Sequence, residues 1–482
     1  MFNWRDRRHP DAGGAELVCE EIAARFAERG ERVVLLTASS PGNARREERD
    51  GYTIVRRGGR FSVYPMALAW LLAHRREIGA VIDSQNGIPS FAPLVVPRAT
   101  PVVLLIHHVH QDQFGDYFPR LAARVARVLE STVTRWVYRD RVVASVSPST
   151  RRDVRIRLGL KGTSYVVPPG APSPRPLGPI SSRSPEPLIV CVGRLVPQKR
   201  TELIVEAMMA VRSELPTARL VVVGDGPHRH AIEAEVARLG LGDCVSLVGA
   251  LAAPERDALV GQAWLTVSAS RREGWGLTIL EANAAGVPAV AFRVPGLKDA
   301  IRHGETGWLV DPDGPLAPSI VEALRELRDH DVARAVRQQA QAWVGNFSWD
   351  AMTDRFAAIL RDESQRLTQA KDNRRLRTDL GCVAEIPRRL LPSDWAGDMR
   401  LGDQAVVTAE QVTFLFHGAD TQSVHRALVR IGVPSDRLAD PEVRVRLARP
   451  RDLVALSASA PVGGITGAAA PPADDPLAEP VL

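Results

Sequence analysis

Short β-rich runs alternate with helical segments through most of this chain, in two successive series. The β-rich runs of the first series are residues 32–37, 52–56, 81–84, 102–106, 142–146 and 165–167. Those of the second series are residues 188–192, 220–223, 245–248, 265–268, 288–292 and 308–310. Segments with helical apolar spacing lie between them, at 15–29, 65–76, 120–138, 201–212 and 230–239. This alternation predicts parallel sheets with helices on both faces.

A segment rich in Pro and Ser, residues 172–187, separates the two series and predicts an interdomain linker. We therefore expect an α/β protein with two Rossmann-like, doubly wound domains, residues 1–171 and 188–345, that face a cleft. Ligands of open α/β sheets bind outside the carboxyl ends of the strands, so the cleft is the expected site. An amphipathic helix at 349–361 is expected to form most of a crossing segment, residues 346–366.

The composition changes beyond this helix. Residues 367–482 form an extension to which the sequence assigns no role. Within the extension, residues 412–416 predict one strand and residues 421–431 predict one helix. Residues 457–482 are mostly small residues and proline, a composition that predicts disorder.

The composition also argues against several classes of protein. No run of eighteen apolar residues occurs, and the polar residues 1–10 do not resemble a signal peptide. Cys19, Cys191, Cys244 and Cys382 stand singly, which is typical of a reduced, cytoplasmic protein. Aromatic residues make up 5% of the chain and form no stacking platform among the basic residues, so nucleic acid is not an expected partner.

The formal charge of +6 is unevenly distributed along the chain. Residues 120–161 contain eleven Lys and Arg residues but three acidic ones. The apolar face of the helix expected at 120–138 consists of Val125, Val128, Leu129, Val133, Trp136 and Val137. Such a helix suits an anionic membrane surface, and a solvated Arg-rich face is the alternative. Peripheral attachment to the inner face of the membrane therefore stays open.

Two glutamates frame the segment that says most about function. Glu273 precedes a Gly-Trp-Gly turn, and Glu281 lies in the second turn of the helix expected at 277–285. Free N–H groups and the positive dipole end of this helix favour a phosphate or a sugar oxygen. A carboxylate at Glu281 can accept two ribose hydroxyls, and one at Glu273 can accept hexose hydroxyls. A pair of surface glutamates at a helix start is the plainer alternative.

Two cations follow the strand expected at 188–192. Arg194 can bind phosphate oxygens through its guanidinium group, and Lys199 adds a second positive charge. Because negative charge grows on a leaving diphosphate, fixed cations stabilise the transition state more than the ground state. Gly14, in a glycine pair that opens the first helix, offers a further anion site. Solvated surface cations and a plain turn are the alternatives.

A histidine follows the apolar strand expected at 102–106. His107 should face the cleft, where it can hydrogen-bond a sugar or contribute its backbone carbonyl. His108 and His110 compete for this role. Three neighbouring histidines can also indicate a metal, but Asp112 alone does not complete a ligand set, so no metal is expected.

Together these motifs resemble those of the retaining, GT-B-fold glycosyltransferases of the family 4 type. The resemblance covers residues 1–361. The motifs that carry it are residues 3–6, 9–10, 12–16, 192–195 with Lys199, 223–227, 273–281 and 284–288. They are specific for the family and carry little information about the substrate.

The resemblance implies a role for each site residue. Arg194 and Lys199 would hold the donor diphosphate, and Gly14 would touch it from the other domain. Backbone groups around Val248 would recognise the base, and His107 would lie near the sugar and the acceptor.

In the same resemblance, the two glutamates separate into different roles. Glu281 would bind the ribose, and Glu273 the transferred hexose. The N–H groups that would assist Glu273 belong to Gly274, Trp275, Gly276 and Leu277. Glu273, Arg194, Lys199 and His107 are the residues from which catalysis is expected.

The implied reaction transfers a hexose of the mannose or glucose type from a nucleotide-diphosphate sugar to a lipid or glycan acceptor. Configuration would be retained by front-face attack assisted by the leaving phosphate, with no cofactor and no required metal. A nucleotide-sugar epimerase or hydrolase on the same fold is the alternative.

The chain departs from the family pattern at two points. It begins at Met1, where the family usually has a full first strand, so either the start is misassigned or the first sheet lacks its central strand. In addition, Pro169 precedes Gly170, where the family commonly has Asn.

Overall fold

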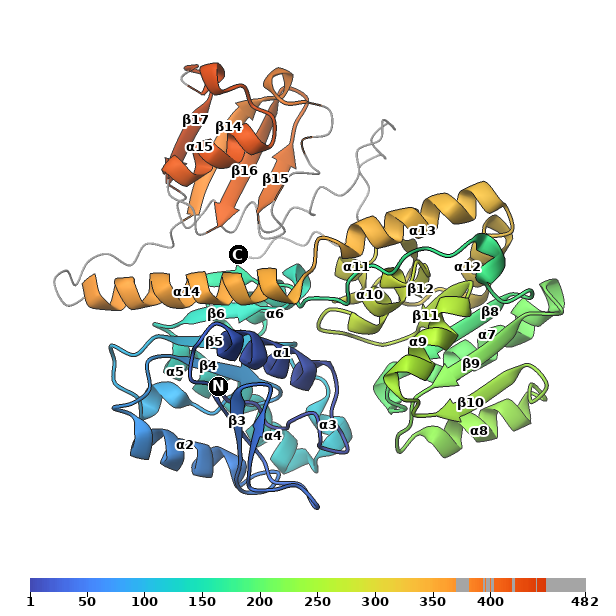
Figure 1. Cartoon of the computed structure of the whole chain (residues 1–482), viewed down its shortest axis with the longest axis horizontal. Helices are drawn as coiled ribbons and strands as arrows, with labels where there is room; N and C mark the ends of the chain where they lie inside the picture. The colour runs from blue at the N-terminus through green and yellow to red at the C-terminus, as the bar shows by residue number, and fades with distance from the viewer. Residues whose placement is uncertain are drawn as a thin grey trace. The chain divides into compact units, whose positions relative to one another are not determined.

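The computed structural model describes residues 1–369, 381–392, 395, 399, 403–417, 421–438 and 440–447 (Figure 1). The chain divides into two compact units, Met1–Arg377 and Thr378–Leu482. The first unit contains two α/β halves, called here the first half (residues 1–171) and the second half (residues 188–345). The expectation of two doubly wound domains is thus confirmed, within a single compact unit.

The sheet of the first half consists of two ladders. Its strands are β1 (Val34–Thr37), β2 (Arg46–Arg49), β3 (Tyr52–Arg56), β4 (Val81–Gln85), β5 (Val102–Ile106), β6 (Val142–Ser145) and β7 (Ser164–Val166). The ladder orders are β1-β3-β2 and β4-β5-β6-β7. β2 runs antiparallel to β3, and the other pairs are parallel. β4, β5 and β6 are buried along their whole length, as parallel strands covered on both faces should be.

The first residues of the chain lie between these two ladders. Phe2 forms parallel bridges to Leu36 in β1 and to Asp83 in β4. The Asn3 N–H donates to the Leu36 carbonyl at 3.1 Å. These first residues therefore join the two ladders into one sheet.

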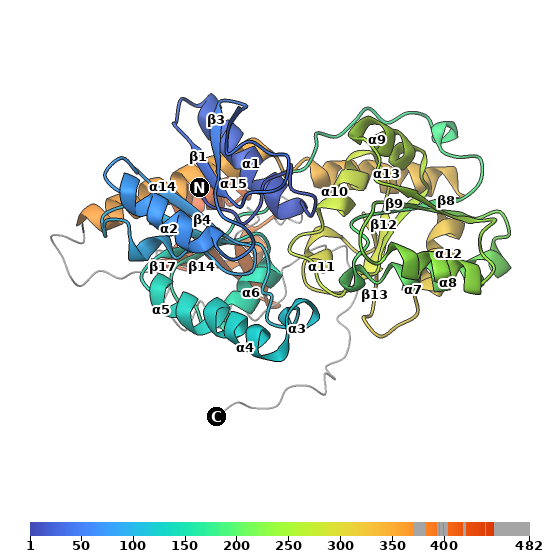
Figure 2. The ribbon, with the colours of Figure 1, turned by 90° about the horizontal axis from the view of Figure 1, so that it is seen from below.

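Helices surround this sheet (Figure 2). They are α1 (Gly14–Glu28), α2 (Val63–His74), α3 (Phe114–Tyr117), α4 (Arg120–Val128), α5 (Thr134–Tyr138) and α6 (Pro148–Ile156). A π-helical turn, η2 (Leu129–Val133), joins α4 to α5, so the expected helix at 120–138 has the predicted extent but a bulge in the middle. α6 was not predicted, because it is a polar helix in which Val154 is the buried apolar residue.

The second half is built on a parallel sheet with the order β10-β9-β8-β11-β12-β13. Its strands are β8 (Leu188–Val192), β9 (Arg219–Val223), β10 (Val245–Gly249), β11 (Leu265–Ser268), β12 (Ala289–Phe292) and β13 (Gly307–Val310). All six match the expected runs to within one residue at either end. The strand order reverses direction between β8 and β11, and ligands of such sheets bind at this switch point.

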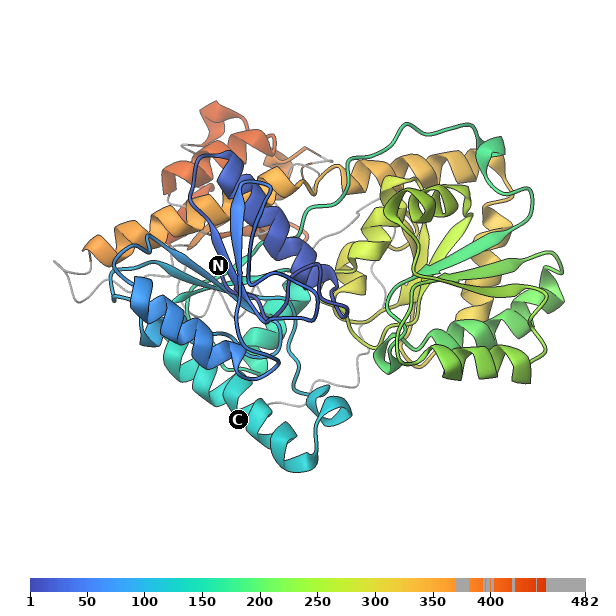
Figure 3. The same ribbon diagram turned by 60° about the horizontal axis from the view of Figure 1, so that its bottom comes forward.

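Helices cover both faces of the second sheet (Figure 3). They are α7 (Thr201–Glu214), α8 (Arg229–Arg238), α9 (Ala253–Gln262), α10 (Leu277–Ala284), α11 (Leu297–Ala300), α12 (Leu316–Glu326) and α13 (His330–Val344). Ile189 of β8 belongs to the apolar cluster of Met208 in α7, whereas Val190 belongs to that of Val260 in α9. Successive strand residues point to opposite faces, so α7 and α9 lie on opposite sides.

Two chain segments connect the halves, and they contact each other. The Ala171 N–H donates to the Phe347 carbonyl at 3.0 Å. A Cβ on Gly170 would lie 2.4 Å from the backbone nitrogen of Trp349. From there α14 (Trp349–Gln369) packs against α1 and β5 and buries Phe356. The crossing helix is therefore longer than predicted, and it belongs structurally to the first half.

The second unit, described by itself, is an antiparallel sheet with one helix. Its strands, in the order β15-β16-β14-β17, are β14 (Gly381–Pro387), β15 (Gln404–Val407), β16 (Gln411–His417) and β17 (Arg444–Leu447). The helix is α15 (Thr421–Arg430). The predicted strand and helix are confirmed, but the expectation of one strand was wrong because β14, β15 and β17 were missed. Residues 457–482, expected to be disordered, lie outside the described residues.

Candidate active site

Glu273 and Lys199 meet at the carboxyl edge of the second sheet. Lys199 ends a 3-10 turn after β8, and Glu273 lies between β11 and α10. Lys199 Nζ is 2.5 Å from Glu273 Oε1, and the Ser270 hydroxyl donates to the same oxygen at 2.7 Å. Burial opposes ionisation of this carboxyl, but the Lys199 charge and the two hydrogen bonds outweigh it and lower the pKa of Glu273. Glu273 is therefore an anion at neutral pH.

A glycine-rich loop supports the loop that carries Arg194. A Cβ on Gly224 would lie 1.9 Å from the Gly193 carbonyl oxygen, and one on Gly226 would lie 2.4 Å from the Leu195 carbonyl oxygen. Both glycines also have positive φ angles. Any other residue at these two positions would displace the Arg194 loop.

The N-terminus of α1 in the first half faces α10 of the second half (Figure 3). Gly14 begins α1 and Leu277 begins α10, and a Cβ on Gly14 would lie 2.9 Å from Leu277 Cδ1. Arg194 Nη1 donates to the Asp11 carbonyl at 3.1 Å, just before α1. The two helix N-termini carry partial positive charge, and Arg194 adds a full one. This arrangement can bind a diphosphate.

The turn before α10 is held in place by its backbone conformation and by aromatic packing. Gly276 has a φ of 87°, so it caps α10 in a conformation that favours glycine. The Trp275 side chain is 3% exposed, and its ring centroid lies 5.1 Å from that of Phe347. Trp275 is therefore a packing residue.

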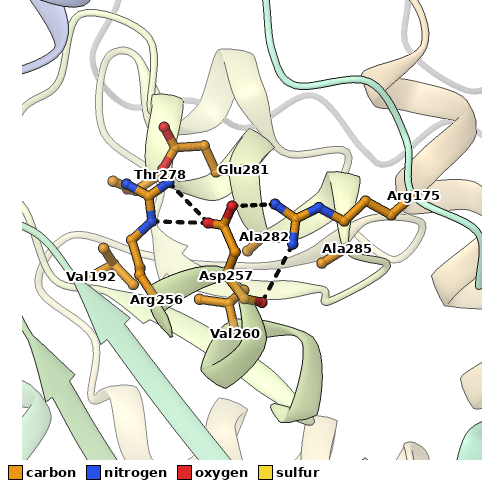
Figure 4. Close-up of a pocket in the computed structure, with 9 residues that line it drawn as sticks. All are labelled: Arg175, Val192, Arg256, Asp257, Val260, Thr278, Glu281, Ala282 and Ala285. Atoms are coloured by element: carbon orange, nitrogen blue, oxygen red, sulfur yellow. Dashed lines mark hydrogen bonds and ion pairs between the residues drawn. The ribbon is translucent and has the colours of Figure 1, made fainter. Parts of the chain in front are cut away.

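Glu281 lines a pocket between α9, α10 and the connecting segment (Figure 4). The other residues of this pocket are Arg175, Val192, Arg256, Asp257, Val260, Thr278, Ala282 and Ala285. Burial raises the pKa of Glu281, although the positive charge of Arg256 works against this. Among the described residues, none hydrogen-bonds to the Glu281 carboxylate, so it can accept hydroxyl groups from a ligand.

An ion-pair chain fastens the connecting segment to this pocket (Figure 4). Asp257 accepts from Arg256 Nη2 at 2.9 Å and from Arg175 Nη2 at 2.5 Å. The Arg175 N–H donates to the Ala284 carbonyl at 3.0 Å. The linker predicted at 172–187 is thus partly fixed to the second half.

The His107 ring lies inside the first half. Its Nε2 is 2.9 Å from Ser84 Oγ and 4.0 Å from Cys19 Sγ. Burial and the neighbouring His108 lower the pKa of His107 to about 3, so the ring is neutral. The His107 carbonyl faces the second half, because a Cβ on Gly274 would lie 2.4 Å from its oxygen. Two contributions were expected from His107, its ring and its backbone carbonyl. The structure places the carbonyl, and not the ring, where the two halves meet.

Some neighbours of the site have no signal in the sequence. Ser270 and Arg272 flank Glu273 on an ordinary polar loop, and only the fold shows that Ser270 holds the carboxylate.

Val248 is 43% exposed in β10, and its expected role in recognising the base of the nucleotide stays a prediction. Among the described residues, no group of three His, Cys, Asp or Glu side chains could hold a metal ion. Metal independence also stays a prediction.

Comparison with protein families matches both halves. Residues 179–343 match the family described as "Glycosyl transferases group 1", and residues 12–173 match "Glycosyltransferase Family 4". Over 240 residues the chain is 30% identical to a GDP-mannose-dependent alpha-(1-6)-phosphatidylinositol monomannoside mannosyltransferase of Mycobacterium tuberculosis, covering 46% of this chain and 62% of that protein. It is 32% identical to a D-inositol 3-phosphate glycosyltransferase of Thermobispora bispora, covering 47% and 57%. The chain thus spans about 60% of the length of these curated relatives.

Solved structures share the fold of the first unit. A sucrose-phosphate synthase from Thermosynechococcus elongatus matches with a TM-score of 0.60 and 21% identity, covering 75% of this chain and 97% of that one. Anabaena HepE in complex with UDP and glucose matches with a TM-score of 0.55 and 18% identity, covering 75% and 98%. At these identities the likeness establishes the fold.

Proposed function

The chain belongs to the group 1, family 4 type of glycosyltransferases with the GT-B fold, and from this we propose that it transfers a hexose from a nucleotide-diphosphate sugar to a lipid or glycan acceptor, with retention of configuration. The observation that carries the proposal is the convergence of Arg194, Gly14 and the Lys199–Glu273 pair at facing edges of the two halves. The mannose or glucose type is favoured by the mannosyltransferase relative and by the neighbour solved with UDP and glucose.

In this proposal the positive groups bind the donor diphosphate. Arg194 and Lys199 neutralise the charge that grows on the leaving group, and the N-termini of α1 and α10 supply N–H donors. Glu281 accepts the ribose hydroxyls within its pocket. Glu273, already an anion beside Lys199, accepts hydroxyls of the transferred hexose and fixes its orientation. The leaving phosphate takes the acceptor proton, so the chain need not supply a general base.

Nucleotide binding is the first test. GDP, UDP and ADP are compared by thermal shift, and a nucleotide at 100 times its dissociation constant should stabilise the fold by about 2.7 kcal/mol. GDP or UDP is expected to give the largest shift. If none of the three raises the melting temperature, the proposal is wrong.

Product analysis separates the proposal from its alternative. A donor labelled in the sugar is incubated with the protein and with candidate lipid or glycan acceptors. A glycosylated acceptor with unchanged anomeric configuration supports the transferase. Free sugar in its place, or an isomerised donor, supports the nucleotide-sugar hydrolase or epimerase that the same fold allows.

We also propose that the acceptor is reached at an anionic membrane surface. Apolar side chains of α4 and α5 are exposed, with Leu121 at 77% and Trp136 at 61%, and Val125 and Val128 extend this stripe. Exposed arginines flank it at positions 120, 124, 135 and 139. Apolar side chains beside basic ones are typical of interfacial helices. No helix among the described residues could span a bilayer.

Liposome flotation tests this surface. Arg127 is left unchanged in this test, because its Nε donates to the Gln111 carbonyl at 2.9 Å and so has a structural role. Replacing Arg124, Arg135 and Arg139 by Gln should therefore weaken binding to anionic vesicles at low ionic strength. The matched control neutralises three exposed arginines of the second half. Equal binding by the two variants would contradict the proposal.

A further inference from the structure

Arg272 lies next to Glu273 in the second half, but its side chain reaches the first half. Its Nη1 forms an ion pair with Asp153 Oδ2 in α6, and its Nη2 is 4.0 Å from Asp112 Oδ2. Asp112 Oδ1 in turn pairs with Arg157 Nη2 at 2.7 Å. We call Arg272, Asp153, Asp112 and Arg157 the Arg272 cluster.

The Arg272 cluster is distinct among the ion pairs of the first unit. Between residues 1–171 and 188–345, the ion pairs of the described residues all involve Arg272. The side chains of Arg272 and Asp153 are 21% and 18% exposed. Salt screens a partly buried pair less than an exposed one, so this contact is stronger than an ordinary surface ion pair.

The loop that carries Arg272 is fixed on both sides. The Arg271 N–H donates to the Gln198 carbonyl at 2.9 Å, and the Glu273 N–H donates to the Pro295 carbonyl at 3.0 Å. A shift of the Arg272 backbone is therefore transmitted to the adjacent Glu273 carboxylate, which Lys199 holds. The contact across the halves and the candidate sugar-binding carboxylate are neighbours on one short, rigid loop.

The start of α6 receives two further contacts, one from Gly274 on the same loop and one from Asp299 in α11. The Thr150 hydroxyl lies 3.4 Å from the Gly274 carbonyl, and the Ser149 N–H donates to Asp299 Oδ2 at 3.3 Å. These two contacts are long and bring no opposite charges together in a pair. Arg272 thus supplies the charged contact at a point where the halves already fit closely.

From this geometry we infer that Arg272 is a positioning residue, which couples closure of the two halves to the placement of Glu273. The inference rests on the proposed function. Closure excludes water from a transfer site, so a loosened closure lets water compete with the acceptor for the donor sugar. Loss of the Arg272 cluster should therefore slow transfer and favour donor hydrolysis, while nucleotide binding to the second half is retained.

The experiment compares Arg272→Gln with Arg271→Gln in the full chain. Arg271 is exposed on the same loop, and no ion pair of the described residues involves it, so the control removes the same charge one residue away. With the nucleotide sugar that the thermal-shift test selects, Arg272→Gln should lower kcat about tenfold. It should also raise the ratio of hydrolysis to transfer and leave the nucleotide dissociation constant within about twofold. The control should behave as the wild type does.

Charge exchange tests the pair directly. Arg272→Asp and Asp153→Arg should each impair transfer, and the double variant should recover much of the loss if the two side chains act as a pair. Arg272→Lys, which keeps the charge but has one nitrogen where Arg272 uses two, should fall between wild type and Arg272→Gln. A merely structural role would instead lower the melting temperature and leave the hydrolysis ratio unchanged.

Failure of this inference is distinguishable from failure of the proposed function. A wild type that transfers no sugar from any nucleotide donor overturns the proposed function. X-ray scattering of the unliganded chain then still tests the cluster, because Arg272→Gln should enlarge the radius of gyration and Arg271→Gln should not. An active wild type whose Arg272→Gln variant matches Arg271→Gln in kcat and in the hydrolysis ratio overturns the inference.

Discussion

At the scale of single residues, the candidate site contains two carboxylates in opposite surroundings. Glu273 is held by a cation and a hydroxyl that lower its pKa, whereas Glu281 lies in a pocket where burial raises its pKa. The first is ordered before any ligand arrives, and the second has unused acceptor oxygens. Different functions are therefore expected for these two glutamates, although they belong to one motif.

Paired Glu→Gln variants test this division. Glu273→Gln should lower kcat by about 100-fold, because an oriented acceptor for hexose hydroxyls becomes a neutral amide, and nucleotide affinity should change little. Glu281→Gln should instead weaken nucleotide binding by roughly tenfold, the equivalent of one hydrogen bond to a charged group. Steady-state kinetics and isothermal titration measure the two effects. The reverse pattern would exchange the assigned roles.

Gly274 lies where the two halves fit so closely that adding one methyl group should reduce activity. A Cβ there would lie 2.4 Å from the His107 carbonyl, a backbone atom that cannot turn away. Gly274→Ala should therefore separate the halves and lower kcat at least tenfold. Gly79→Ala is the control, since a Cβ at Gly79 meets nothing within 4 Å. Comparable activity of the two variants would mean that the halves do not meet at Gly274 during catalysis.

Single residues also mark the limit of prediction from sequence. Glu273 and Lys199 could be identified because each follows a strand and neighbours a glycine or apolar pattern. Arg272 could not be identified in this way. The sequence around a loop arginine is the same whether its side chain is solvated or pairs with a residue far away in the chain, such as Asp153. His107 was placed correctly at a strand end, but the burial of its ring depends on Cys19 and Ser84, which come from other elements.

At the scale of elements, the π-helical turn η2 has a chemical consequence. It buries Glu130, whose Oε1 accepts from the His110 N–H at 2.6 Å and whose Oε2 accepts from Gln111 Nε2 at 2.7 Å. The carboxylate thereby fixes the loop after β5. Burial nevertheless raises the pKa of Glu130 to about 7.

This raised pKa predicts how stability changes with pH. Between about pH 4.5 and 7, the unfolded chain has lost the Glu130 proton and the folded chain keeps it, so stability falls as pH rises. The contribution is at most roughly 3 kcal/mol. Urea denaturation at pH 5 and at pH 8 should show a smaller loss in Glu130→Gln than in the wild type. The lowered pKa values of buried His108 and His110 act in the opposite direction in the wild type.

Elements with a strong apolar pattern were predictable, and those without one were not. β5 is five apolar residues, and α10 ends just before Gly286, so both followed from local rules. β2 is made of Arg and Glu and is an edge strand stabilised by pairing with β3, a contact that no local pattern shows. β14 is buried between two neighbours, but its short run of Gly, Cys, Val and Ala resembles a loop.

At the scale of the whole first unit, one helix follows the second half in sequence but packs on the first half. α14 follows the second half along the chain but packs against α1 and β5 of the first, where Met352, Phe356 and Ile359 are buried. Arg355 Nη1 adds a hydrogen bond to the Val166 carbonyl at 3.1 Å. Such a crossing helix was expected at residues 349–361, within a crossing segment at 346–366, and in the structure it extends to Gln369.

Truncation tests how much the first half depends on α14. A chain ending at residue 348, just before α14, loses the burial of these three large apolar side chains, a cost on the order of 5 kcal/mol. It should melt at a lower temperature than a chain ending at residue 377, the boundary of the first unit. Calorimetry of both chains measures the difference. Equal melting temperatures would show that the first half is stable without the helix.

The position of α14 also orders events during synthesis. A ribosome releases the chain from its N-terminus, so the sheet of the first half emerges early while the helix that covers part of it emerges only after the entire second half. During that interval β5 and α1 lack a covering element, and such surfaces attract chaperones or aggregate. Folding of the second half does not depend on a later segment, because its strands and helices, β8 to α13, are contiguous in the chain. It can fold as it emerges and leaves the first half to be completed last.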